Sequence, residues 1–248
     1  MKVRSIASGS SGNAYIVEHD GRVLLIDCGV PYKYLKDLAI DAVLITHSHS
    51  DHVSGLKVLL KHCDAPVFAN SMTAETVARG CGLDDEVFVR FENDQVFEIG
   101  DFEISPFPIP HDTSDPVGYL VRLASTGVTY FHGTDIGTPL ESIGNRLARA
   151  DIAVLESNHD PVLLRQSSRP SSLIQRIAGP RGHLSNDQAC ELVRRFASSR
   201  LKKLALAHLS RDCNMPHLAE EAMRSALLEI GRADVELKVL RPDEIVEL

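Results

Sequence analysis

Short apolar runs separated by turns dominate the first half of the chain, and this pattern predicts β-strands. Residues 3–7, 14–18 and 23–26 are such runs, and the turns between them are rich in Ser, Gly, Asn and Asp. The pattern predicts further strands over residues 42–46, 66–69, 86–91, 95–99, 101–107, 117–124 and 128–132. In the second half, strands are predicted over residues 152–156, 204–208 and 235–240, the last of the chain.

Helical spacing of apolar residues appears between these runs. Residues 53–62 carry Val53, Leu56, Leu59 and Leu60, which would share one helix face. Helices are also predicted over residues 71–79, 139–147, 186–197 and 216–230, with Asn186 as the N-cap of the third of these. The stretch 160–182 is rich in Ser, Pro, Gly and Arg, and we expect it to be an irregular, mobile loop.

Strands and helices alternate in both halves without a linker or a repeat. This alternation predicts an α/β fold with one domain over residues 1–248. We expect two sheets packed face to face with helices outside.

Composition and charge indicate the class of protein and its location, but they say less about its function. The 248 residues are 44% hydrophobic and 24% charged, which is ordinary for a globular protein. The net charge of −8 argues against a generally basic nucleic-acid-binding surface. Five cysteines without a C-x-x-C motif argue against a disulfide framework or a zinc knuckle. No signal peptide or membrane span is apparent, so we expect a cytoplasmic protein without membrane contact.

One cluster of metal-binding side chains stands out. Residues 46–52 read T-H-S-H-S-D-H directly after an apolar run, which places His47, His49, Asp51 and His52 at a strand end. Imidazole suits zinc, iron and manganese, and a carboxylate can hold a second cation or orient a water. These four side chains could supply part of the ligands for two adjacent metal ions.

Three further residues of the same chemistry follow predicted strands. They are His111, Asp135 and His208. The C-terminal ends of strands are the usual location of function in α/β sheets. Each residue alone is weak evidence, but together with the cluster they make a set of seven metal ligands.

The order H-x-H-x-D-H, then His, Asp and His, resembles the metallo-β-lactamase superfamily over nearly the whole chain. The resemblance implies a four-layer αβ/βα sandwich with two mixed sheets. It also implies that His47, His49 and His111 hold one metal ion and that Asp51, His52 and His208 hold the other, while Asp135 bridges. Asp27, in the turn Ile-Asp-Cys-Gly, looks like the residue that supports the metal loop in this family.

Several longer stretches resemble the WalJ/YycJ-type branch, which is associated with DNA exonuclease activity. They lie at residues 8–13, 111–119, 156–160, 181–186 and 207–211. DNA is therefore the expected substrate and partner, and no protein partner can be inferred. We expect Ser10, Asn13, Asn158 and Arg181 to bind substrate. The alternatives are that residues 8–13 form a plain hairpin turn and that the arginines of 165–181 belong to a solvated loop.

The resemblance also implies a mechanism for phosphodiester hydrolysis. A metal-bridging hydroxide would attack phosphorus, and Asp51 would orient it and accept its proton. His183, oriented by Glu156, would protonate the leaving group, as in the similar motifs of the tRNA 3′-processing nucleases. Otherwise His183 would only cap the helix that begins near Asn186.

Two other functions stay open at this point. One is hydrolysis of a small thioester, lactone or cyclic phosphodiester, for which His183 would not be needed. The other is a non-catalytic metal-binding protein. For the cofactor we expect two divalent ions per chain, zinc first, with manganese or iron as alternatives, because affinity alone does not select among them.

Overall fold

The computed structural model describes residues 1–242 and 244–248, and this part of the chain forms two seven-stranded sheets. The first sheet has the order β14-β1-β2-β3-β4-β5-β6. Its strands are β1 (Lys2–Ala7), β2 (Ala14–His19), β3 (Arg22–Ile26), β4 (Ala42–Leu44), β5 (Val67–Asn70), β6 (Phe88–Phe91) and β14 (Val246–Glu247). β14 and β1 to β3 pair antiparallel, whereas β3 to β6 pair parallel.

The second sheet repeats this plan in the order β13-β12-β11-β10-β9-β8-β7. Its strands are β7 (Phe97–Ile99), β8 (Phe102–Pro108), β9 (Val117–Leu123), β10 (Thr129–Gly133), β11 (Ile152–Glu156), β12 (Lys203–Ala207) and β13 (Glu236–Val239). β7 to β10 pair antiparallel and β10 to β13 pair parallel. Both sheets are mixed, as predicted.

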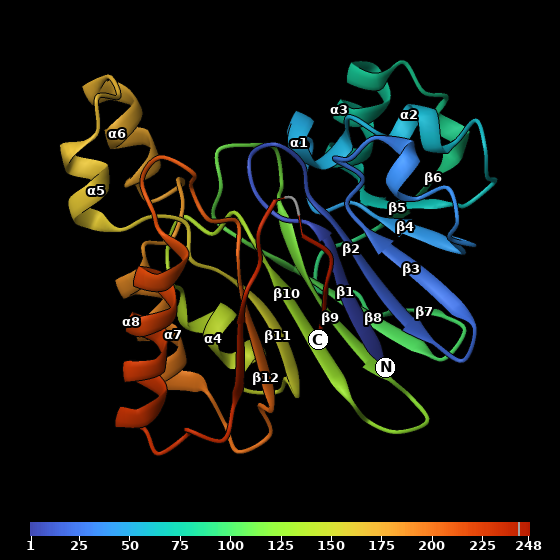
Figure 1. Cartoon of the computed structure of the whole chain (residues 1–248). Helices are drawn as coiled ribbons and strands as arrows, with labels where there is room; N and C mark the ends of the chain where they lie inside the picture. The colour runs from blue at the N-terminus through green and yellow to red at the C-terminus, as the bar shows by residue number, and fades with distance from the viewer. Residues whose placement is uncertain (243) are drawn as a thin grey trace.

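Helices cover the outer faces of the two sheets (Figure 1). α1 (Ser50–Val53), α2 (Leu56–Leu59) and α3 (Ser71–Cys81) lie beside the first sheet, and α4 (Glu141–Leu147), α7 (Asn186–Phe196) and α8 (Pro216–Glu229) lie beside the second. Single 3-10 turns form at Tyr32–Tyr34 and Asp85–Val87. The four-layer sandwich expected from the resemblance is therefore confirmed.

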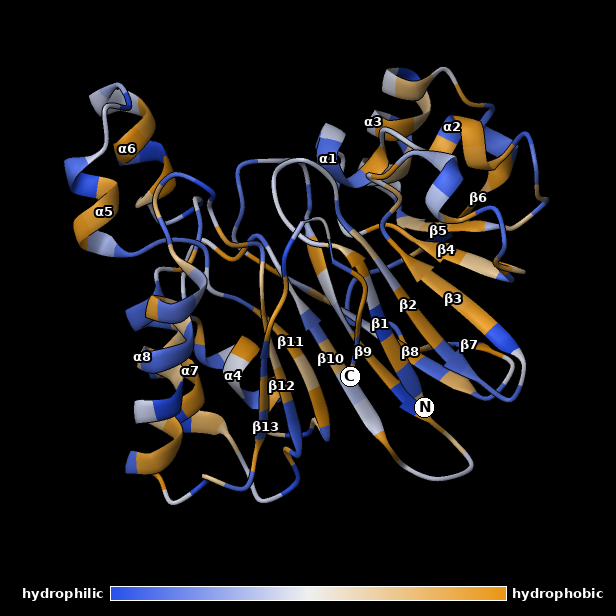
Figure 2. Ribbon diagram, viewed as in Figure 1, coloured by the Kyte–Doolittle hydropathy of each residue, from blue (hydrophilic) through white to orange (hydrophobic). Residues whose placement is uncertain are grey.

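Apolar burial explains why the layers stay together. One buried cluster lies between the sheets and joins side chains of both, such as Tyr15 and Leu24 from the first and Phe102 and Tyr119 from the second. Two further clusters fill the spaces between each sheet and its helices. Figure 2 shows the corresponding pattern, with apolar strands and helices that are apolar along one side.

Several predicted elements are wrong in type or extent. Residues 53–62 do not form one helix, because two single turns, α1 and α2, replace it. The stretch 160–182 is not an irregular loop, since it contains α5 (Pro161–Gln166) and α6 (Ser171–Ile177). These two helices form an arm that projects from the second sheet (Figure 1), and we call it the α5–α6 arm.

Two end points also differ from the prediction. Ser185, not Asn186, is the N-cap of α7: its hydroxyl accepts from the Gln188 N–H, and the Gln188 side chain accepts from the Ser185 N–H. Residues 235–240 do not hold the last strand of the chain, because β14 follows and pairs with β1. Among the described residues, no helix has the length and apolar character needed to cross a membrane.

Candidate metal centre and active site

The predicted metal ligands gather at one end of the sandwich, where strands of both sheets end. Residues 47–52 follow β4, and His111, Asp135 and His208 follow β8, β10 and β12. The two sheets thus contribute opposite sides of one site. The backbone is unusual here, because Asp135 and His208 have left-handed φ angles of 60° and 55°. Such conformations in residues other than glycine are concentrated at functional sites.

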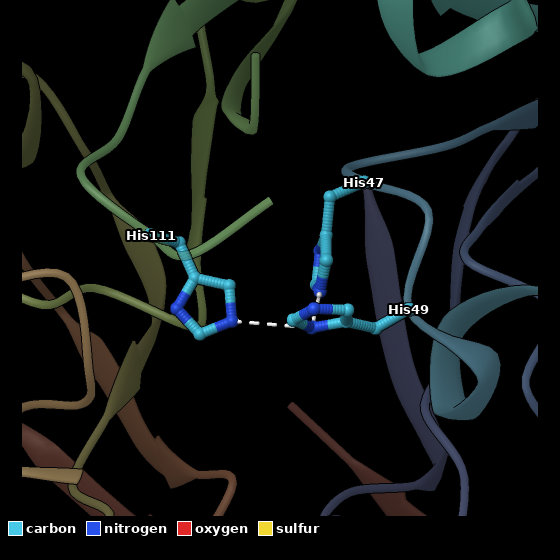
Figure 3. Close-up of side chains that lie close together, drawn as sticks. All are labelled: His47, His49 and His111. Carbon is cyan, nitrogen blue, oxygen red and sulfur yellow. Dashed lines mark hydrogen bonds between the residues drawn. The ribbon is translucent and has the colours of Figure 1, made fainter. Parts of the chain in front are cut away.

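Three histidines make the first cluster (Figure 3). His47 Nε2 lies 3.2 Å from His49 Nδ1, which lies 3.3 Å from His111 Nε2. His47 and His49 come from the loop after β4, and His111 reaches them from the second sheet. The three nitrogens point toward one another, which is the arrangement that a shared cation would stabilise.

A second cluster lies beside the first. Asp51 Oδ2 is 3.6 Å from the Nε2 atoms of both His52 and His208. Asp135 stands between the clusters, because its Oδ2 is 3.3 Å from His52 Nε2 and its Oδ1 is 3.7 Å from His111 Nε2. Asp135 is buried, so its charge faces the histidines rather than solvent.

The second nitrogen of most of these rings faces an oxygen of the surrounding protein. The pairs are His47 Nδ1 with Thr46 Oγ1 at 3.0 Å, His52 Nδ1 with Asp27 Oδ2 at 2.7 Å, His111 Nδ1 with the Gly182 carbonyl at 3.0 Å, and His208 Nδ1 with Glu156 Oε1 at 3.1 Å. Such partners fix the orientation of a metal-ligating ring and leave the opposite nitrogen to the metal.

The residues fit two divalent cations. Asp135 Oδ2 and His208 Nε2 are buried without a hydrogen-bond partner among the described residues, and both point into the cluster. Buried polar atoms left in this way are costly unless a cation or water satisfies them. Histidine and aspartate ligands accept zinc, manganese or iron.

Electrostatics in the site also favours cation binding. Burial and the neighbouring His52 lower the pKa of His47 well below its usual value, so its ring is neutral and free to ligate. Burial lowers the pKa of His208, but Asp135, Asp51 and Glu156 raise it to about 10. The same carboxylates that hold a proton on His208 would hold a metal ion.

His183 and Glu156 form a pair at the edge of these clusters. His183 Nδ1 lies 2.8 Å from Glu156 Oε1, while Glu156 Oε2 accepts from the backbone N–H groups of Ile136 and Leu184 at 2.8 and 3.0 Å. Burial would raise the pKa of Glu156, but His183 and the hydrogen bonds from His183 and His208 hold it at about 2. Because His183 Nδ1 is paired with the ionised Glu156, Nε2 is the ring nitrogen of His183 that stays available to a substrate.

Asp27 anchors the loop of residues 46–52, which we call the metal loop. Its carboxylate accepts from the Thr46 N–H and hydroxyl and contacts His52, and it is completely buried. Gly29 lies so close to this loop that an added Cβ would meet the Asp51 carbonyl at 1.7 Å. The turn at residues 27–29 therefore needs a glycine where it crosses the loop.

A cleft of about 300 Å³ opens over the clusters. The α5–α6 arm forms one wall and contributes Arg169, Leu173, Arg176 and Ile177. The rest of the lining consists of metal-ligand residues and other polar side chains. Among the latter are Ser10, Ser50, Asn158 and Ser210, of which Ser10 and Asn158 are predicted to bind substrate. His183 also faces the cleft.

The other two predicted substrate-binding residues have structural partners instead. Asn13 is buried, where it exchanges hydrogen bonds with Gly9 and donates to Asp51 Oδ2 at 3.3 Å. Arg181 donates to the backbone carbonyls of His111 and Thr113. Neither lines the cleft. For these two residues, substrate binding stays a prediction.

The sequence resembles known enzymes along most of its length. A family model described as "Beta-lactamase superfamily domain" matches residues 22–208. The chain belongs to the metallo-β-lactamase superfamily. Its fold agrees, because the metallo-β-lactamase fold protein YhfI from Bacillus subtilis superposes with a TM-score of 0.74 at 16% identity, covering 100% of this chain and 99% of that one.

Two relatives in this superfamily are similar over nearly their whole length. The chain is 33% identical to "Exodeoxyribonuclease WalJ" of Streptococcus pneumoniae over 241 residues, which cover 92% of this chain and 89% of the relative. It is also 33% identical to "Exodeoxyribonuclease YycJ" of Bacillus anthracis over 237 residues, with 91% and 89% covered. The predicted resemblance to both the superfamily and this branch is confirmed. With its histidine- and aspartate-rich metal site, the chain is a metallo-hydrolase of that superfamily.

Some contributors to the site were missed at the sequence level. Thr46 and Ser210 attract no attention as isolated hydroxyl residues, and Asp112 has no predicted role of its own beside His111. The adjacent His-Asp pair was the one available signal, because a carboxylate next to a metal ligand is a common outer partner. The apolar Leu173 and Ile177 could not be placed without the arm that carries them.

Proposed function

We propose that this chain is a metal-dependent phosphodiesterase that degrades DNA as an exonuclease. The observation that carries the proposal is the His183–Glu156 pair: His183 lines the same cleft as the two metal-ligand clusters, and the buried Glu156 lies behind it. A hydrolase acting on a phosphodiester needs a proton for a poor alkoxide leaving group, whereas the thiolate of a thioester leaves without one. The names of the two relatives that match more than 90% of this chain support the same reaction.

The ligand residues divide between two ions in this proposal. His47, His49 and His111 hold one, and Asp51, His52 and His208 hold the other. Asp135 would serve both ions, because its Oδ2 lies beside His52 of one cluster and its Oδ1 beside His111 of the other. Such a pair, zinc first or else manganese or iron, would lower the pKa of a water and offset charge on the phosphoryl oxygens.

The remaining steps fall to side chains of the protein. Asp51 lines the cleft, so its carboxylate can orient the attacking water and take its proton. His183 donates a proton to the leaving oxygen from its cleft-facing nitrogen, and Glu156 keeps the ring oriented and its charge compensated. Ser10 and Asn158 line the cleft and contact the substrate there.

Two arginines line the cleft of a protein whose net charge is negative. Arg169 and Arg176 from the arm face the metal site although the chain carries −8 overall. Phosphate contacts of this kind supply most of the affinity of a protein for a nucleic-acid backbone. An acidic surface with a basic arm over the site would bind a strand end at one place only.

The size of the cleft supports a second candidate, a hydrolase of a small thioester, lactone or cyclic phosphodiester. A volume of about 300 Å³ lies at the lower end of small-molecule sites. With a thioester as substrate, His183 would be dispensable for activity. The digestion experiment separates the two candidates.

The experiment uses duplex and single-stranded DNA labelled at either end, with protein loaded with zinc or manganese. We expect stepwise shortening from one end, lost in Asp51→Asn because the water loses its orienting carboxylate. Glu191→Gln, on the solvent side of α7, serves as the matched control and should digest like the wild type. Full metal occupancy with no digestion of either form of DNA would overturn the proposal in favour of a small substrate.

A further inference from the structure

The predicted ligand His49 has its second ring nitrogen, the one turned away from the cluster, near a side chain that lines the cleft. Its Nδ1 faces His47 and His111, so Nε2 is its outer nitrogen. That Nε2 lies 3.7 Å from Oδ1 of Asp112, the residue directly after His111. Asp112 Oδ1 is also 3.5 Å from His111 Nε2.

The two carboxylate oxygens of Asp112 have different surroundings. Its Oδ1 is buried and has no hydrogen-bond partner among the described residues. Its Oδ2 accepts from Arg176 Nε, and this ion pair joins the loop after β8 to α6 of the arm. The carboxylate therefore stands between a metal-ligand ring and an arginine that lines the cleft.

Arg176 is placed to exchange partners. Its side chain is 60% exposed whereas that of Asp112 is 25% exposed, so a phosphate in the cleft can reach the guanidinium more easily than the carboxylate. Arginine binds a phosphate and a carboxylate with the same planar set of donors. A strand in the cleft would compete with Asp112 for this residue.

We propose that Asp112 is a positioning residue for His49 and that Arg176 couples it to the substrate. With Arg176 on a DNA phosphate, Asp112 loses its cationic partner, and its full negative charge acts on His49 and the ion of the first cluster. DNA binding and metal binding then strengthen each other, because coupling between two sites is reciprocal. The substrate half of this inference rests on the proposed function, whereas the role of Asp112 toward His49 does not.

The arm provides its own comparison. Arg169 also lines the cleft, but it pairs with Asp212 at 2.9 Å, and no contact links Asp212 to a ligand histidine among the described residues. Arg165 lies on α5 of the same arm and does not line the cleft. Substitution of Arg169 therefore tests the loss of a cleft arginine alone, and substitution of Arg165 tests the loss of a positive charge alone. Only substitution of Arg176 also removes the contact with Asp112.

The first measurement is the zinc affinity of the protein without DNA, by competition with a chromophoric chelator. We expect Asp112→Asn to weaken one of two zinc sites ~10–100-fold, as removal of an outer partner does. Arg176→Gln should bind zinc as tightly as the wild type or more tightly, because it leaves Asp112 uncompensated. Unchanged zinc affinity in Asp112→Asn, or equal weakening in Arg176→Gln, would overturn the role of Asp112.

The second measurement repeats the zinc competition with a phosphorothioate oligonucleotide that resists cleavage. DNA should tighten zinc binding in the wild type, in Arg165→Gln and in Arg169→Gln, but not in Arg176→Gln. Tightening that persists in Arg176→Gln would overturn the exchange. A wild type that binds no DNA would count against the exchange and against the proposed function, whereas the zinc affinities of the first measurement would still decide the role of Asp112.

Discussion

The proton that His183 delivers is the most specific contribution of a single side chain in the proposed reaction. His183→Gln should lower kcat for DNA ~10²–10⁴-fold, because general acid catalysis is worth about that much for a poor leaving group. The same variant should keep nearly full activity toward bis(p-nitrophenyl) phosphate, whose leaving group needs no proton. Steady-state kinetics on both substrates measures the difference.

Metal analysis accompanies this comparison, because Glu156 contacts both His183 and His208. His183→Gln is expected to retain two ions per chain, whereas Glu156→Gln disturbs the orientation of His208 as well. Equal losses on both phosphodiesters in His183→Gln would show that the residue binds substrate rather than donating a proton.

At the level of side chains, the sequence predicted local features better than distant ones. The set from His47 to His208 could be recognised because each ligand follows a strand that its own neighbours specify. The position of Arg176 beside Asp112 could not, since 64 residues separate them and the fold alone brings them together. Asn13 and Arg181 form hydrogen bonds with the backbone of Gly9 and His111, and these contacts could not be predicted from the sequence either.

The turn that crosses the metal loop should be intolerant of any side chain. Gly29→Ala would force its Cβ to within 1.7 Å of the Asp51 carbonyl, so the loop must move. We expect Gly29→Ala to lose metal and activity, and to lower the free energy of unfolding by about 1–3 kcal/mol, typical of overpacking. Metal content and urea unfolding report the two effects.

Gly80→Ala is the matched control, because no atom lies within 4 Å of its added Cβ and it sits inside α3. Alanine in a helix interior is favoured over glycine by up to about 1 kcal/mol, so this variant should be unchanged or slightly more stable. A Gly29→Ala protein with full metal content would show that the loop tolerates displacement.

Among the elements, the strands other than β14 were predicted within a few residues, whereas β14 and the α5–α6 arm were missed. Periodicity identifies elements that bury a continuous face, but α6 has no fully buried residue, and α5 buries Leu164 alone. The start of α5 is marked by local signals instead, because Asp160 caps it and Pro161 is its first residue. A composition rich in Ser, Pro and Gly concealed these signals.

The two sheets share one buried layer, and this bears on how the whole chain unfolds. That residues 1–248 fold as one domain stays a prediction, but side chains of both sheets meet in the central cluster. Neither sheet can lose this layer without exposing the other. The two halves should therefore open together rather than in sequence.

Two buried cysteines allow this to be measured. Cys28 lies in the cluster under α1 to α3, and Cys190 lies in α7 on the opposite side, where burial raises its pKa to about 11. Both should resist a thiol reagent at pH 8 in the folded protein, while the half-buried Cys63 reacts first. In increasing urea, Cys28 and Cys190 should become reactive at the same midpoint, as read by mass spectrometry of labelled peptides. Separate midpoints would mean that the halves unfold independently, and the domain prediction would then be wrong.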